Sequence, residues 1–142
     1  MIRFFPPEEE DRIIQAIQQA ERNTSGELRV HLEEDCRGDV MKEAARIFQK
    51  LGMHKTAARN GVLIFIAPER RQFAIIGDRG INEKVPPDFW AQERDLMREH
   101  FKRGEFTEGV CAVIGQIGEK LQAYFPYQSD DENELPDDIS YN

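Results

Sequence analysis

The sequence of 142 residues has only two cysteines, Cys36 and Cys111, too few for a disulfide framework. It contains no CxxC or HExxH motif and no paired Cys/His spacing, which argues against a structural zinc site. We therefore expect two reduced thiols. Cys111 is predicted to lie in the core, where free cysteines are most often found, whereas Cys36 falls in a polar loop.

Long hydrophobic runs are also missing. No stretch approaches the length of a membrane-spanning helix, and the N-terminal "MIRFFPPEEEDR" has no apolar signal-peptide core. The sequence thus predicts a cytoplasmic protein without membrane insertion.

An excess of positive charge is absent as well. The net charge is −8, and six acids with no Lys or Arg lie between Pro126 and Asn142, which leaves about −2 for the rest of the chain. An acidic chain of this kind has no general attraction for nucleic acid or for an anionic membrane.

Common catalytic motifs do not occur. There is no G-x-S-x-G, P-loop or G-x-G-x-x-G sequence. The three histidines are far apart, and His31 lies on the polar face of an alternating segment, where we expect a surface residue rather than a proton carrier.

Hydrophobic periodicity predicts helices and strands in the order α-β-α-β-β-α-α. The elements are a helix after Pro6-Pro7, a strand at "ELRVHLEE", a helix capped by Asp39, strands at "GVLIFIAP" and "QFAIIG", a helix after "VPPD" and a helix over residues 106–124.

The order of elements predicts the fold class. The β-α-β portion requires a right-handed crossover and gives two parallel strands, and the hairpin adds a third, antiparallel strand. Helices must cover both faces, because "GVLIFIA" has no polar side to present to water. We expect an α/β protein, a three-layer α/β/α sandwich with a small mixed sheet.

Strand polarity brings polar residues to one edge of this sheet. The first strand starts at Glu27, the second starts after Asn60, and the antiparallel third strand returns Asp78 to the same edge. Carboxylate and amide oxygens are the hard donors that calcium and magnesium prefer. The edge is a candidate metal site; alternatively, Glu27 and Asp78 cap turns or pair with Arg59 or Arg79.

A second acidic group lies at the opposite edge of the predicted sheet. Its members follow the first strand, and a solvated loop and a metal site are both compatible with them: Glu33, Glu34, Asp35 and Asp39.

Three segments carry a resemblance to a known family: "TSGELRV", "RNGVLIFIAPERRQFAIIGDRGINEKV" and "FKRGEFTEGV". They resemble the TPM domain family, which includes plant thylakoid-lumen proteins and many bacterial proteins. The ending "FP…NELPD" is similar to that of a small soluble bacterial subgroup. We accordingly expect a TPM-like α/β/α domain over residues 1–125 and an acidic tail over residues 126–142.

The resemblance implies divalent-cation binding, by calcium or magnesium, in a crevice at the end of the sheet, and a phosphatase activity suggested for some members. Glu27, Asn60 and Asp78 fall at the matching motif positions. The chain departs from its relatives at Asn82, where the subgroup often has histidine. Many relatives carry an export signal and a C-terminal membrane anchor, and from this sequence we expect neither.

The tail allows two interpretations. Its composition favours disorder, whereas the subgroup's "NELPD" ending favours a docked segment. In the second interpretation Asp131, Asn133 or Glu134 contributes to the cation site or covers it.

Three functions remain open. The favoured hypothesis is a cation-binding domain with a non-catalytic or protein-maintenance role, with a possible protein partner. The alternatives are a cation-dependent hydrolase of phosphoesters and a structural module that uses the acidic tail to bind a basic partner.

Overall fold

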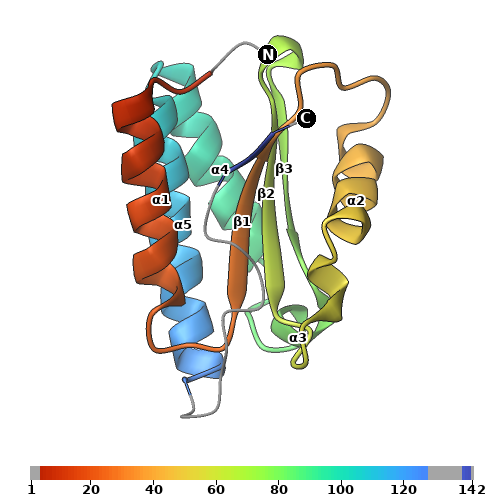
Figure 1. Cartoon of the computed structure of the whole chain (residues 1–142), viewed down its shortest axis with the longest axis vertical. Helices are drawn as coiled ribbons and strands as arrows, with labels where there is room; N and C mark the ends of the chain where they lie inside the picture. The colour runs from red at the N-terminus through yellow and green to blue at the C-terminus, as the bar shows by residue number, and fades with distance from the viewer. Residues whose placement is uncertain (1–3, 128–138, 142) are drawn as a thin grey trace.

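The structure is a computed structural model of the whole chain and describes residues 4–127 and 139–141. The helices and strands follow the predicted order, with additional short elements between them and a strand at the C-terminus (Figure 1). The elements are α1 (Pro7–Glu21), β1 (Glu27–Leu32), α2 (Val40–Lys50), η1 (Met53–Lys55), β2 (Gly61–Ala67), η2 (Pro68–Arg70), β3 (Gln72–Gly77), α3 (Arg79–Asn82), α4 (Phe89–Lys102), α5 (Phe106–Tyr124) and β4 (Ser140–Tyr141).

The described strands form one mixed sheet in the order β3-β2-β1-β4. β1 and β2 are parallel, with Glu27 opposite Gly61, and β2 and β3 are antiparallel, with Val62 opposite Gly77. This arrangement confirms the predicted small mixed sheet. The strand β4, which pairs in parallel with the end of β1, was not foreseen.

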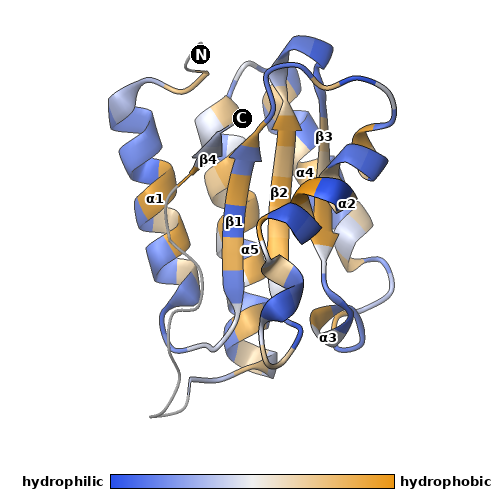
Figure 2. Ribbon diagram, turned by 45° about the vertical axis from the view of Figure 1, so that its right-hand side comes forward, coloured by the Kyte–Doolittle hydropathy of each residue, from blue (hydrophilic) through white to orange (hydrophobic). Residues whose placement is uncertain are grey.

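Helices cover both faces of the sheet (Figure 1). One core lies between the sheet and the helices α1, α4 and α5, and a second core lies between the sheet and α2. All seven residues of β2 are buried, which explains why that strand is apolar along its length, whereas polar residues interrupt β1 (Figure 2). The three-layer α/β/α sandwich is therefore confirmed.

Local sequence signals set the ends of the first two helices. Pro7 begins α1 and three glutamates occupy its first turn, where they face the positive end of the helix dipole. The Asp39 carboxylate accepts a hydrogen bond from the Met41 backbone N–H (3.0 Å), so the predicted N-cap of α2 is confirmed. Over the described residues, no helix is both long and apolar enough to cross a membrane.

Candidate functional site

At the start of β1, two acidic residues flank a glycine across the sheet. Glu27 lies opposite Gly61, and the Asp78 backbone N–H donates to the Gly61 carbonyl oxygen (2.9 Å), which places Asp78 on the other side of Gly61. Because side chains alternate along a strand, Glu27 and Asp78 project toward the same face as Leu63 and Ala74, which pack in the α2 core. Both acids are buried, with 2% and 8% of their surface exposed. We call Glu27, Gly61 and Asp78 the acidic row.

A backbone carbonyl lies over the middle of the acidic row. A Cβ atom at Gly61 would be only 2.8 Å from the Met53 carbonyl oxygen in η1, so only glycine leaves room for that oxygen. Neighbouring strands are about 4.8 Å apart, which puts the Cα atoms of Glu27 and Asp78 about 10 Å apart. The row thus places an acidic residue on either side of a glycine that a backbone carbonyl overlies, a contribution of Met53 that sequence patterns do not reveal.

The Asp78 carboxylate is held by Arg59. The Arg59 Nε donates to Oδ2 (2.6 Å) and its Nη2 donates to Oδ1 (2.9 Å), a bidentate pair. The same Oδ1 also accepts from the Arg79 backbone N–H (2.8 Å). The hydrogen bond to Asp78 raises the pKa of Arg59 above its ordinary value, so the guanidinium stays charged. The ion pair that the sequence offered as one interpretation of Asp78 is present, and one lone pair of Oδ2 remains beyond these bonds.

Asn60 reaches the same edge but turns toward the preceding loop. Its Nδ2 donates to the Ser25 Oγ (3.2 Å), and its backbone N–H donates to the Thr56 Oγ1 (3.2 Å). The Asn60 Oδ1 is buried and accepts no hydrogen bond from any residue within 4–127 or 139–141. Topology therefore brings Glu27, Asn60 and Asp78 to one end of the sheet, as predicted.

The glycine after Arg79 explains how α3 fits against this edge (Figure 1). A Cβ at Gly80 would lie 2.1 Å from the Ala58 carbonyl oxygen, and the Gly80 N–H donates to the Arg59 carbonyl oxygen (2.8 Å). Asn82 closes the same turn: its Nδ2 donates to the Gly77 carbonyl oxygen (2.9 Å), and its Oδ1 accepts from the Trp90 Nε1 (2.7 Å). Asn82 therefore joins β3 to α4.

His31 is buried, and its predicted surface position is wrong. Only 2% of it is exposed, its Nδ1 lies 2.9 Å from the Ser140 Oγ and its Nε2 lies 3.2 Å from the Glu33 Oε1. The ring also stacks on Phe65, with 5.6 Å between centroids. The unforeseen strand β4 covers this end of β1, and the His-x-Glu spacing on one strand face was the signal available in the sequence.

The acidic group after β1 does not form a single site. Glu33 is buried against His31, whereas Asp39 caps α2, and Asp35 is exposed beside Arg37. In the same loop Cys36 is 4% exposed, and burial raises the pKa of its thiol, which keeps it protonated and unreactive.

The remaining predicted residues take different positions. Asp131, Asn133 and Glu134 lie outside the described residues. Cys111 is half-buried at the edge of the core. Among the residues the structure describes, no three His, Cys, Asp or Glu side chains are grouped so as to hold a metal ion. A cation at the acidic row would thus rely on two carboxylates, a carbonyl oxygen and water.

Comparison with known proteins gives the family. A family model described as the TPM domain matches residues 2–120. This chain belongs to the TPM domain family.

The solved structures agree with this assignment. The NMR structure of the BA42 protein from the psychrophilic bacterium Bizionia argentinensis is 44% identical, superposes with a TM-score of 0.91 and covers 100% of this chain and 98% of that one. An N-terminal domain from P. gingivalis is 15% identical, with a TM-score of 0.72 over 87% of this chain and 82% of that one. An N-terminal domain from Corynebacterium glutamicum is 14% identical, with a TM-score of 0.68 over 94% and 84%. The last two share the fold alone, and no curated protein matches the chain.

Proposed function

We propose that this chain is a TPM domain that binds calcium or magnesium at the acidic row, in a non-catalytic or protein-maintenance role. The observation that carries the proposal is the arrangement of Glu27 and Asp78 on either side of Gly61, with the Met53 carbonyl oxygen above it. Carboxylate and carbonyl oxygens are hard donors, and both ions retain waters when the protein supplies few ligands.

The donor set fits such an ion only in competition with Arg59. The guanidinium already neutralises Asp78, so an ion must use the remaining lone pair of Oδ2 or displace the arginine. Glu27 then supplies the second carboxylate. A positive neighbour disfavours a cation, so we expect a weak site; Asp131, outside the described residues, stays a predicted further ligand.

A calcium and magnesium titration of the full chain, followed by backbone amide NMR shifts, tests the proposal. The amides of Glu27, Met53, Gly61 and Asp78 should shift together and saturate in the micromolar-to-millimolar range typical of sites with few charged ligands. Glu27→Gln should weaken binding by about tenfold or more, because one ligand loses its charge. The matched control Glu34→Gln, at the opposite end of β1, should leave the affinity unchanged.

Arg59 offers a second, independent readout. In Arg59→Gln the Asp78 carboxylate loses its cation, so the variant should bind calcium more tightly and gain more in melting temperature from it than the wild type does. Arg37→Gln, which removes an exposed arginine from an ion pair with Asp35, is the control. Absence of any amide shift at millimolar calcium and magnesium would remove the proposed site.

The same samples distinguish the enzymatic alternative. Phosphate release from a model phosphoester that stops on adding a chelator and is lost in Glu27→Gln would favour the hydrolase over the binding domain. Saturable cation binding without turnover supports the proposal as stated.

A further inference from the structure

The C-terminal residues 139–141 fill a slot at the edge of the sheet, independent of the acidic row. Ser140 and Tyr141 pair in parallel with His31 and Leu32 at the end of β1. Ile139, 4% exposed, enters the core between the sheet, α1 and α5. Ile139 and Tyr141 thus lie on the α1 and α5 side of the sheet and Ser140 lies on the opposite side, as alternation along an extended chain requires.

The middle position is a specific hydrogen-bonding site. Burial lowers the pKa of His31, which favours a neutral ring. If the ring donates through Nε2–H to the Glu33 carboxylate, Nδ1 is left as an acceptor, and the Ser140 hydroxyl is the donor that satisfies it at 2.9 Å. A side chain without a hydroxyl at this position would leave a buried ring nitrogen unsatisfied.

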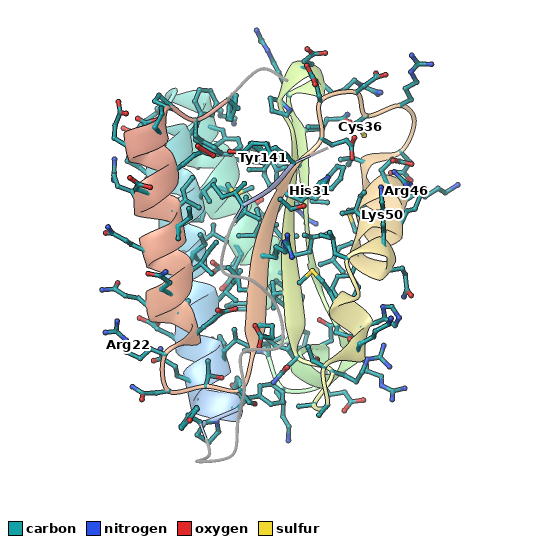
Figure 3. The ribbon with its side chains drawn as sticks, viewed as in Figure 1. Arg22, His31, Cys36, Arg46, Lys50 and Tyr141 are labelled. Carbon is teal, nitrogen blue, oxygen red and sulfur yellow. The ribbon has the colours of Figure 1, made fainter. Side chains whose placement is uncertain are left out.

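The third position is fixed from the other face of the sheet. The Tyr141 hydroxyl donates to the Glu10 Oε1 on α1. Figure 3 shows Tyr141 on the α1 side of β1 and His31 on the α2 side. The slot therefore recognises an apolar, a hydroxyl and an aromatic side chain from groups on three elements.

We propose that this slot is a strand-addition site for an extended peptide, which the chain's own C-terminus occupies in cis. In such sites main-chain pairing to a sheet edge provides affinity and the side-chain positions provide specificity. The ligand is an extended segment that carries the Ile-Ser-Tyr pattern or a close equivalent. Because the C-terminus belongs to the same chain, its effective concentration at the slot is on the order of millimolar, and it competes with any peptide in trans. A peptide in trans therefore binds once the cis segment is released.

The test uses the full-length chain with Ile139→Asp, which places a charge in the core position and should release the segment. The probe is a fluorescently labelled peptide of residues 137–142, DDISYN. It should bind the variant about tenfold or more tightly than it binds the wild type, in which the slot is occupied. The His31 imidazole NMR signals should move in the variant and return toward their wild-type positions as peptide is added.

Matched peptides test the recognition rule. DDDSYN should not bind, since it repeats the core charge. DDIAYN should bind about fivefold or more weakly because it leaves His31 Nδ1 without a donor, whereas DDITYN keeps the hydroxyl and should bind nearly as well as the parent.

Circular dichroism first establishes that Ile139→Asp is folded; if it is not, Tyr141→Ala in the full chain takes its place. Two results would overturn the proposal. One is that the His31 signals are unchanged in the released variant, and the other is that DDISYN does not bind that variant at several times the millimolar effective concentration. Equal binding of DDIAYN and DDISYN would overturn the assigned role of Ser140. Calcium binding at the acidic row does not enter any of these outcomes.

Discussion

The sheet edge where β1 starts holds a pair of opposite charges, Arg59 and Asp78, whereas the other end of β1 carries an imidazole, His31, held by a hydroxyl and a carboxylate. The Arg59–Asp78 pair joins β3 to the loop before β2, and Arg59 is still one-third exposed. The His31 contacts are buried almost completely and reach the last residues of the chain. A charge pair with a partly exposed guanidinium can exchange partners with an ion from solution, while a buried hydrogen-bonded network recognises a fixed shape. This contrast underlies the two proposals: an ion site at one end and a peptide site at the other.

The largest expected effect comes from breaking the charge pair. Asp78→Ala removes the bidentate ion pair and the hydrogen bond to the Arg79 N–H, and should lower the free energy of unfolding by about 3 kcal/mol. Arg59→Gln should destabilise the chain more than Asp78→Ala does. It leaves the buried Asp78 carboxylate without its cation, whereas Asp78→Ala leaves only the partly exposed Arg59 guanidinium without its partner. Urea unfolding followed by Trp90 fluorescence measures both; a smaller loss in Arg59→Gln than in Asp78→Ala would contradict this account.

A fourth buried acid, Glu93, sharpens the comparison, because it forms no ion pair of this kind with the residues that the structure describes. Glu93 on α4 is 2% exposed, and with the Gln116 side-chain amide nitrogen turned toward it, its Oε1 accepts a hydrogen bond of 3.1 Å. Burial, with a smaller contribution from Glu119, raises the pKa of Glu93 to about 7. The folded state therefore resists ionisation of Glu93, unlike Asp78, whose charge Arg59 compensates.

Replacing this acid should stabilise the chain. The rise from 4.5 to about 7 corresponds to at most about 3 kcal/mol, and we expect Glu93→Gln to gain about 2 kcal/mol at pH 8. Because the folded-state pKa is raised, the penalty is fully present above pH 7 and disappears as the pH falls toward 4.5. The gain should therefore vanish near pH 4. The exposed Glu99→Gln on the same helix is the control, and an equal gain at pH 4 and pH 8 would exclude ionisation as the cause.

The pattern of the sequence was sufficient to predict the strands β1, β2 and β3 and the sheet edge where β1 starts. Apolar runs placed β2 and β3, and strand polarity alone brought Asp78 back to Glu27 and Asn60. The carbonyl oxygen of Met53 could not be foreseen, because its position depends on how η1 packs on Gly61 rather than on its side chain.

The other end of β1 was harder to predict for a physical reason. His31 alternates with apolar residues and so reads as a solvent-facing position, but a two-residue strand more than a hundred residues away covers it. Strand β4 is too short to have a periodicity of its own, and the acidic composition before it favours a solvated segment. Long-range pairing decided this region, and local patterns do not encode it.

A smaller effect should follow from removing the donor to His31. Ser140→Ala leaves the buried Nδ1 unsatisfied and should lower the free energy of unfolding by about 1 kcal/mol, whereas Ser140→Thr keeps the hydroxyl and should cost less. Equal destabilisation by the two substitutions would show that packing, and not the hydrogen bond, holds the segment.

The smallest effect is the pH dependence that His31 contributes, and its sign distinguishes it from that of Glu93. Burial lowers the pKa of His31 below 6.5 in the folded state, so the unfolded chain takes up a proton first as the pH falls. The contribution of neutral His31 to stability is therefore present above pH 6.5 and is lost as the pH falls from 6.5 toward the lowered folded-state pKa. The Glu93 penalty decreases over an overlapping pH range, with the opposite sign. Urea unfolding of wild type and His31→Gln between pH 8 and pH 4 should show that the variant loses less stability on acidification. The control for the general effect of losing an imidazole is His100→Gln, which removes a half-buried histidine beside Glu105. If wild type and His31→Gln lose stability in parallel between pH 8 and pH 4, the His31 ring is not held neutral. The Ser140 hydroxyl is then not the donor on which the peptide slot depends.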